Sequence, residues 1–356
     1  MGLPLKPSNI PQTVWSRIGR NLHLNQRHPV GIVSSMIHNH FKQSGFVSAP
    51  LPPTPIVTTQ QAFDNLLVPV DHVLRSTSDT YYVTDSTVLR PHATSHQRDV
   101  LTWLHAQEFK GATWTCDVYR KDEVDRIHFP VFHQTDGVKV FGSGVSDDAV
   151  VTDLQSSLES LMGFLFDAAG KPFVHRWDRS ATFPFTHPSM EMEILLKDAW
   201  IECLGCGKIK TEIDPNGWAF GIGIDRLAML LFEIDDIRTL WSQDSRFLDQ
   251  FEANKIVKFK PFSKYPATFR DTAFWLSGPL DAAQLGFHVM QIAGPLGLEK
   301  IELIDSFVHP KSGKKSVCFR FTYRGIEKTL TSEECNLAHR LVEEYIEKEL
   351  CGDIRR

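Results

Sequence analysis

The sequence predicts an α+β protein, in which a mainly antiparallel sheet flanked by helices is followed by a ferredoxin-like βαββαβ module. Three expected strands, at 190–196, 199–205 and 217–222, follow one another without crossover helices, which favours an antiparallel sheet. After residue 265 the expected order is strand, helix, strand, strand, helix, with a fourth short strand in the last residues, which is the split βαβ arrangement. Neither pattern identifies a function by itself.

The first expected element is a helix over residues 29–44. Pro29 suits the first helical position, apolar residues follow at helical spacing, and Gly45 suits the carboxyl-terminal cap. A strand is expected at 46–49. The proline-rich stretch SAPLPPTPIVTT then ends it, because proline continues neither a helix nor a central strand.

A second helix is expected from about Thr94 to Phe109, with Thr94 or Ser95 as its amino-terminal cap. The remaining elements of the first domain, besides the three strands above, are strands at 114–120 and 131–141, a helix at about 149–169 and a helix that starts near Ile224. Those of the module are strands at 266–276, 299–308 and 316–324 and helices at 281–293 and 331–350. The expected domains are an amino-terminal extension (1–27), the sheet domain (28–255), a linker (256–264) and the ferredoxin-like module (265–356).

Composition limits the classes of function. Of the 356 residues, 42% are hydrophobic and 23% are charged, which is typical of a soluble globular protein. No apolar run approaches the roughly 18 to 20 residues that span a bilayer, and the first residues lack the apolar core of a secretion signal. The net charge is −5, yet residues 256–356 carry 15 Lys and Arg against 13 Asp and Glu. A slightly basic module on an acidic body can contact phosphates locally, although ordinary charge scatter also explains the difference.

The six cysteines show no disulfide pattern. Cys203 and Cys206 form an isolated CxxC, and no second pair at zinc spacing follows. We therefore interpret them as small residues of a buried strand and turn.

A polar hairpin is the first feature that points to chemistry. The strand TWTCDVYR ends at Arg120, and in the return strand VFHQTDG alternation places Phe132, Gln134 and Asp136 on one face. An aromatic ring, an amide and a carboxylate on one face can stack a planar ring and attract an ammonium group, and Arg120 can bind phosphate or carboxylate with two donors. A solvated face of an ordinary hairpin is the alternative.

Two further features follow along the chain. Phe183 and Phe185 would share a face of a strand and form an aromatic slot, although a pair of core aromatics has the same pattern. In GWAFGIGIDRLAML, Gly221 and Gly223 lie at a strand-to-helix junction, with Arg226 in the first helical turn. A cation there is unfavourable for the helix dipole, which indicates that an anion balances it.

These features, in this order, resemble the three signature motifs of the class II aminoacyl-tRNA synthetases. The unit of helix, Gly45 and strand resembles motif 1. The strand that ends at Arg120, with its loop and return strand, resembles motif 2, and GIGIDRL resembles motif 3. Within the class, HPVGIVSSMI, LRPHATSHQ, YRKDEVDRIHFPVFHQTDG, FPFTHPSMEME, WIECLGCG and AFGIGIDRLAML are similar to the phenylalanyl-tRNA synthetases. The segments PFSKYPATFRDTAFWL and FVHPKSGKKSVCFRFTYR resemble the ferredoxin-fold anticodon-binding domain of that family, and the fusion of the two domains resembles its single-chain organellar form.

The resemblance implies a function, partners and site residues. We expect ATP-dependent attachment of phenylalanine to tRNA(Phe) through a phenylalanyl-adenylate, with Mg²⁺ entering on ATP and no metal held by the protein alone, in a monomer of the mitochondrial matrix with no membrane partner and no editing domain. Arg120 and Arg226 are the expected catalytic residues. Those expected to bind ATP are Arg120, Asp122, His128, Phe132, Asp225 and Arg226; those for phenylalanine are His92, Thr94, Gln134, Asp136, Phe183, Phe185, Ala219 and Gly221; those for tRNA are Lys311, Lys314, Lys315, Arg320 and Arg324.

Two residues depart from the family pattern, since Asp225 and Asp136 stand where glutamate is usual. Three alternatives remain at this stage. An unrelated hairpin-rich binding protein would require the three ordered motifs to be a coincidence. The class II core could act on another amino acid, although Phe183, Phe185 and Ala219 favour an aromatic substrate. A non-catalytic, tRNA-binding paralogue is disfavoured because such paralogues usually lose one of the two arginines.

Overall fold

The computed structural model of the chain describes residues 9–121, 124–196, 199–214, 216–260, 265–278, 280, 282–325 and 328–355. The chain divides into two compact units, Met1–Lys260 and Pro261–Arg356. The first contains the large sheet and the second the ferredoxin-like module, so the expected α+β fold class is confirmed. Within the described residues, no helix is long and apolar enough to cross a membrane.

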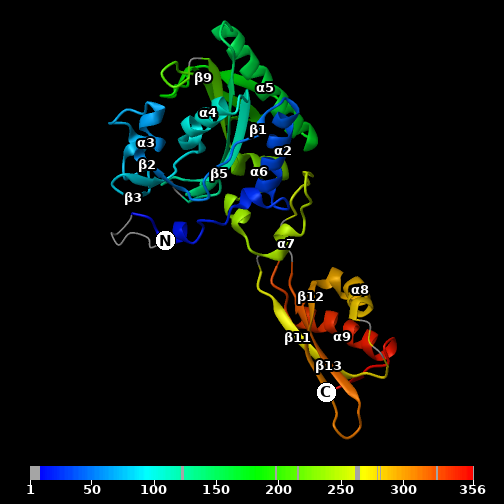
Figure 1. Cartoon of the computed structure of the whole chain (residues 1–356). Coiled ribbons are helices and arrows are strands. Elements are labelled where there is room, and N and C mark those ends of the chain that lie inside the picture. The colour runs from blue at the N-terminus through cyan, green and yellow to red at the C-terminus, as the bar shows by residue number, and fades with distance from the viewer. Residues whose placement is uncertain are drawn as a thin grey trace. The chain divides into compact units, whose positions relative to one another are not determined.

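The first unit is built on a sheet to which the described residues contribute seven strands, in the order β1-β5-β6-β10-β9-β8-β7. Only the β1–β5 pair is parallel among the described pairs of this sheet, and the others are antiparallel. The strands are β1 (Val47–Ser48), β5 (Gly111–Tyr119), β6 (Val131–Val140), β7 (His175–Asp178), β8 (Thr186–Leu196), β9 (Ala199–Ile209) and β10 (Gly217–Gly223). A small sheet at one side contains β2 (Ile56–Thr58), β4 (Thr87–Leu89) and β3 (Tyr82–Thr84) (Figure 1).

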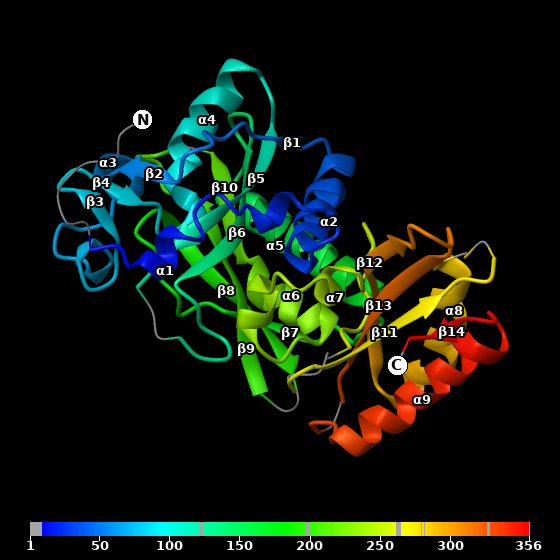
Figure 2. The same ribbon diagram turned by 90° about the horizontal axis from the view of Figure 1, so that it is seen from below.

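Helices cover the large sheet on both faces because successive side chains of its strands point to opposite faces. On β5, Ala112, Trp114 and Cys116 pack with α4 (Gln97–Ala106), whereas Thr113 and Thr115 hydrogen-bond to side chains of α2 (Pro29–Gln43). The α2 layer also contains α5 (Asp147–Ala168) and α6 (Ile224–Phe232). In Figure 2, β6 and β10 lie between α4 and this layer.

Short elements complete the first unit. They are α1 (Gln12–Trp15), η1 (Leu22–Leu24), α3 (Thr59–Ala62), η2 (Asp64–Leu66), η3 (Val73–Arg75), η4 (Ala93–His96), η5 (Ile237–Trp241) and α7 (Ser245–Leu248).

One local expectation was wrong. The helix expected from Thr94 begins at Gln97, and neither Thr94 nor Ser95 caps it. The reason is tertiary, because η4 precedes the helix and the Thr94 hydroxyl donates to the Asp136 carboxylate at 2.7 Å. The pair Phe183 and Phe185 lies in the turn before β8 and not in a strand.

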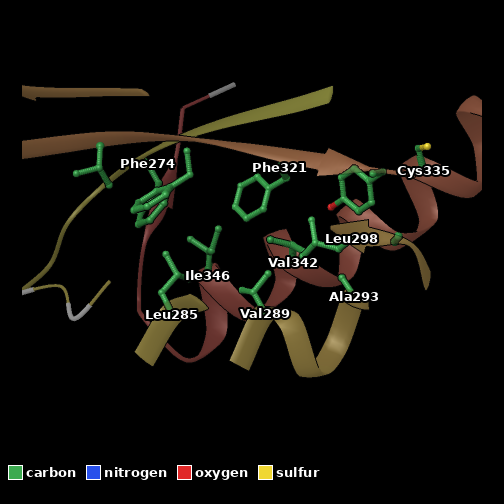
Figure 3. Close-up of a cluster of buried hydrophobic side chains, with 13 residues drawn as sticks. Phe274, Leu285, Val289, Ala293, Leu298, Phe321, Cys335, Val342 and Ile346 are labelled. Atoms are coloured by element: carbon green, nitrogen blue, oxygen red, sulfur yellow. The ribbon is translucent and has the colours of Figure 1, made fainter. Parts of the chain in front are cut away.

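The second unit has the strand order β12-β13-β11-β14 in its described residues. Its elements are β11 (Thr268–Trp275), α8 (Ala282–Ala293), η6 (Gly294–Leu296), β12 (Leu298–Val308), β13 (Lys315–Tyr323), α9 (Ser332–Lys348) and β14 (Asp353–Ile354), so the fourth short strand is present. Both helices lie on one side of the sheet (Figure 1). Phe274, Phe321, Val289 and Val342 meet in the buried core between sheet and helices (Figure 3). Among the described residues of this unit, no helix covers the opposite face of the sheet.

A buried polar network stabilises the end of β5. Arg90 and Asp117 form an ion pair with both side chains 4% exposed, and Tyr119 donates its hydroxyl to the same carboxylate. Arg90 also donates to the Asp117 carbonyl at 2.6 Å and lies 3.2 Å from His96 Nε2. Burial alone would raise the pKa of Asp117, but the charge of Arg90 and the Tyr119 hydrogen bond lower it, so the carboxylate is ionised at neutral pH.

We predict that Asp117→Ala destabilises the first unit by about 3 to 5 kcal/mol, because it leaves the Arg90 guanidinium buried and unpaired. Urea unfolding followed by tryptophan fluorescence measures the change. Asp64→Ala is the control, since Asp64 pairs with Arg75 in the same unit but is 54% exposed and should cost less than about 1 kcal/mol. Equal effects of the two substitutions would contradict the prediction.

Candidate active site

A cavity of about 530 Å³ lies in the first unit, at the ends of β5, β6, β9 and β10 and the turn before β8. Strand alternation puts Phe132, Gln134 and Asp136 of β6 on the cavity side, as the sequence predicted, while His133 and Thr135 point to the helix layer. Every described residue that was expected to bind ATP or phenylalanine lines this cavity: His92, Thr94, Arg120, His128, Phe132, Gln134, Asp136, Phe183, Phe185, Ala219, Gly221, Asp225 and Arg226. Asp122 lies outside the described residues.

Asp136 is a carboxylate at the buried end of the cavity, with 2% of its surface exposed. Its Oδ2 accepts the Thr94 hydroxyl at 2.7 Å, while Oδ1 has no hydrogen-bond partner in the described part of the chain. Gly221 lies directly across the β6–β10 ladder, and a Cβ there would lie 3.0 Å from Asp136 Oδ1. Glycine thus leaves space in front of an acceptor that lacks a donor, which suits a bound ammonium group.

Electrostatics at this end of the cavity favour a cationic ligand group. Burial raises the pKa of Asp136 to about 7, and the Thr94 hydrogen bond and the Arg120 charge oppose that rise without cancelling it. Burial, and next the charge of Arg120, lower the pKa of His92 to about 3, so its imidazole is neutral at pH 7. A ligand ammonium next to Asp136 would favour the ionised carboxylate.

Gln134 is fixed in place by η4. Its side-chain oxygen accepts from the Ala93 backbone N–H at 3.0 Å, and the Ala93 carbonyl accepts from the Trp114 indole at 3.0 Å. Both contacts tie the η4 backbone to the sheet. The Gln134 amide nitrogen therefore has a defined orientation.

Phe183 and Phe185 form the aromatic wall. Their rings are nearly parallel, at 13°, with centroids 5.9 Å apart. A ring stacked between them would need about 7 Å, twice the contact distance of carbon atoms, so a ligand ring must contact their edges. Gly205 supports Phe183 from behind, since a Cβ at Gly205 would lie 2.7 Å from the Phe183 Cζ atom.

The side of the cavity towards the hairpin carries cations and an aromatic ring. The Arg120 guanidinium lies 5.7 Å from the Phe132 ring centroid, and its Nε donates to the Pro91 carbonyl at 2.8 Å. Arg226 lies in the first turn of α6, which begins directly after Gly223. His128 is paired with Asp125 at 2.9 Å. The arginines suit phosphate groups, and Phe132 offers a face for a planar base.

Sequence reasoning missed part of the wall. Phe129, Glu202, Gly205 and Cys206 also line the cavity. The available signal was the alternation in WIECLGCG. Burial raises the pKa of Cys203 to about 12, so this thiol stays protonated. The described residues contain no cluster of three or more His, Cys, Asp or Glu that could hold a metal ion.

The residues expected to contact tRNA lie in the second unit. Lys311 and Lys314 belong to the turn between β12 and β13, and Lys315 begins β13. Arg320 pairs with Asp271 at 2.7 Å, and Arg324 pairs with Glu299 at 3.0 Å. The three lysines, on an exposed turn, are therefore better placed for a phosphate backbone than the two arginines, whose charges are already compensated within the unit.

Comparisons with known proteins identify both units. The family described as tRNA synthetases class II core domain (F) matches residues 15–251, and the ferredoxin-fold anticodon binding domain family matches residues 263–355. The chloroplastic/mitochondrial phenylalanine–tRNA ligase of Arabidopsis thaliana is 40% identical, over 98% of this chain and 83% of its own length. The mitochondrial phenylalanine–tRNA ligases of Mus musculus and Saccharomyces cerevisiae are 39% and 33% identical, over 95% and 98% of this chain and 83% and 92% of their own lengths.

The antiparallel sheet, the two arginines and the matched core define a class II aminoacyl-tRNA synthetase. The similarity extends over almost the whole chain, including the carboxyl-terminal module. The chain belongs to the phenylalanine–tRNA ligase family, in the group whose relatives carry mitochondrial or chloroplastic names.

We predict that phenylalanine binding depends on pH through Asp136. With a pKa of about 7, the carboxylate that attracts the ammonium group forms as pH rises, so KM for phenylalanine should rise about tenfold between pH 8 and pH 6. Because burial makes this carboxyl harder to ionise in the folded state than in the unfolded state, the unliganded fold also becomes less stable as pH rises towards 7. Pyrophosphate exchange at several phenylalanine concentrations measures KM.

Asp136→Asn is the control for this prediction. It should raise KM for phenylalanine at pH 8 far more than KM for ATP, and it should flatten the pH profile. A pH-independent KM in the unsubstituted protein, or equal changes in the two KM values, would contradict the assignment.

Proposed function

We propose that this protein activates phenylalanine with ATP and transfers it to tRNA(Phe) in organellar translation. The observation that carries the proposal is the buried Asp136, whose Oδ1 lacks a hydrogen-bond partner among the described residues and lies in the same cavity as an aromatic wall and two arginines. Ammonium, phenyl ring and phosphates are the three groups that phenylalanine and ATP bring together. The relatives' names support the same activity.

In the proposed first step, Asp136 holds the ammonium group and the edges of Phe183 and Phe185 contact the phenyl ring. The Arg120 guanidinium orients the amino-acid carboxylate towards the α-phosphorus, with adenine on the Phe132 ring and Arg226 on its other side. The carboxylate oxygen forms a bond to phosphorus and pyrophosphate leaves. Because the nucleophile is already an anion, no protein base is required, and the two arginines stabilise charge on the phosphates.

Magnesium neutralises phosphate charge when it is bound. We propose that it enters with ATP, because the cavity carboxylates do not form a closed set of ligands. Asp136 and Asp225 are buried, and the Asp225 oxygens accept hydrogen bonds from His133. Glu202 lines the cavity and is exposed, so it is the described carboxylate best placed to contact a nucleotide-bound cation.

In the second step a terminal ribose hydroxyl of the tRNA attacks the adenylate carbonyl, and AMP leaves. A matrix location and a monomeric state are part of the same proposal; the mitochondrial names of the relatives support the former.

We expect exchange of pyrophosphate into ATP to be stimulated by phenylalanine more than by any other standard amino acid. Tyrosine should be the strongest competitor, and since the cavity must desolvate its hydroxyl, it should be weaker by roughly 10 to 200-fold in kcat/KM. Measuring exchange with each amino acid tests this. Preference for a non-aromatic amino acid would overturn the phenylalanine assignment, whereas no stimulation by any amino acid would favour a non-catalytic paralogue.

The tRNA contact is proposed to include the helix-free face of the second unit's sheet. Trp275 of β11 and Phe307 of β12 both pair with Ser316 of the strand between them, so their side chains lie on the same face of the sheet. Their ring centroids are 6.3 Å apart. His309 lies 6.0 Å from Trp275, and the Arg355 guanidinium lies 5.0 Å from the Trp275 ring centroid. Aromatic rings and arginine on a sheet, beside the lysines of the β12–β13 turn, suit stacking of unpaired bases.

We predict that Phe307→Ala raises KM for tRNA in aminoacylation by about fivefold or more, since one base stack contributes about 1 to 3 kcal/mol. Phenylalanine-dependent exchange should stay within about twofold of the unsubstituted protein, because the first unit carries that reaction. Leu337→Ala is the control, as Leu337 is 55% exposed on α9, on the other side of the sheet. Unchanged charging by Phe307→Ala, or equal effects of both substitutions, would contradict this contact.

A further inference from the structure

The junction between β10 and α6 contains a contact that ties two walls of the cavity together. The β6–β10 ladder ends where Gly223 lies opposite Gln134. One residue beyond that point, the His133 backbone N–H donates to Asp225 Oδ2 at 2.6 Å. The carboxylate thus takes the place that a strand carbonyl would occupy if β10 continued, and the ladder extends by one hydrogen bond into the helix.

The same carboxylate also holds the His133 ring. Nδ1 of His133 lies 3.0 Å and 3.2 Å from the two Asp225 oxygens, and the side chains are 0% and 2% exposed. With Nδ1 as the donor and the carboxylate oxygens as acceptors, the ring forms a second contact with the same side chain. Backbone and ring of one residue are therefore bound by a single buried side chain.

The His133 ring is packed by segments far from it in the sequence. It stacks on Trp241 of η5 at 24° with centroids 5.6 Å apart, and it contacts His23 of η1 at 5.3 Å. The Arg17 guanidinium lies over both Trp241, at 5.7 Å, and Phe129 of the cavity wall, at 4.9 Å. Residues of the amino-terminal segment thus support the strand from behind the cavity.

The paired residues are next to cavity side chains in the chain. The neighbours of His133 on β6 are Phe132 and Gln134, which point to the cavity, and the neighbour of Asp225 on α6 is Arg226. Gln134 is also held by Ala93, so loss of the Asp225–His133 contact should affect Phe132 and Arg226 first. These are the two residues proposed to hold adenine.

We infer that Asp225 and His133 form a positioning pair that sets the spacing of Phe132 and Arg226 around the nucleotide, and that Asp225 does not itself bind ATP. The inference rests on the proposed function for its kinetic readout. It replaces the expectation that Asp225 is an ATP ligand, because the oxygens of this buried carboxylate accept hydrogen bonds from His133. An Asp225 carboxylate turned to the nucleotide would leave the His133 donors buried without acceptors.

The test compares Asp225→Asn, His133→Phe and the double substitution. Asparagine at 225 keeps one acceptor oxygen, but its NH2 group is a donor and cannot accept a hydrogen bond from His133. Phenylalanine at 133 keeps an aromatic ring for stacking but removes the ring donor. Each single substitution should raise the ATP Kd, measured by titration calorimetry, and the KM for ATP in exchange by about tenfold, with KM for phenylalanine within about twofold. The double substitution should be no more than about twofold worse than the worse single one, because both remove the same contact.

Two controls separate positioning from general destabilisation. Asp214 is a second buried aspartate with a histidine partner, at 2.7 Å from His105, and it lies outside the cavity. Asp214→Asn should lower the thermal midpoint without changing the ATP Kd. Asp225→Glu retains a carboxylate and should recover most of the ATP affinity that Asp225→Asn loses. This comparison still tests the inference if His133→Phe or the double substitution does not fold.

An unchanged ATP Kd in His133→Phe beside a raised Kd in Asp225→Asn would overturn the inference and indicate a direct ligand. Additive effects, giving about a hundredfold loss in the double substitution, would overturn it as well. ATP binding without any phenylalanine-dependent exchange in the unsubstituted protein would instead contradict the proposed function, while the calorimetric comparison would still decide on the positioning pair.

Discussion

The two-residue period of strand β6 is the constraint on which the site depends. Because successive side chains point to opposite faces, Phe132, Gln134 and Asp136 enter the cavity while His133 and Thr135 enter the helix layer. A shift of one residue in the pairing with β10 would exchange the two sets completely. The register is specified from both sides, since Gly221 accommodates Asp136 on the cavity face and the Asp225 carboxylate holds the strand on the other.

Two buried polar groups near the cavity differ in how far the protein satisfies their hydrogen bonds. Asp136 keeps one oxygen without a protein donor among the described residues, which costs free energy in the unliganded fold that the proposed ammonium group would recover. The neighbouring Arg90, Asp117, Tyr119 and His96 show the opposite arrangement, in which every buried charge has a close partner. The first arrangement suits the ammonium binding proposed for Asp136, and the second supports the end of the strand that leads to Arg120.

Much of the fold and site could be predicted from the sequence, because strand alternation, helix spacing and ordered motifs are local patterns. The antiparallel sheet, the ferredoxin-like module and the convergence of the described candidates in one cavity agree with that prediction. The start of α4 was wrong because Thr94 looked like a cap, whereas its hydroxyl is bound to Asp136, 42 residues away. The structure places Phe183 and Phe185 in a turn, which the sequence left open because two aromatics around a proline fit a strand and a turn equally well.

By itself the sequence determined the class of fold, the order of the motifs and the residue types that phenylalanine and ATP require, since all of these depend on patterns along a few neighbouring residues. Only the tertiary structure decided which residue Asp225 contacts, how the two phenylalanine rings lie relative to each other and which cations of the second unit are already paired. Those properties depend on partners distant in the chain, such as His133 for Asp225, Gly205 for Phe183 and Asp271 for Arg320. These contacts cannot be predicted from local sequence patterns, because several residues could serve as the partner and only the packing of the fold brings one of them close.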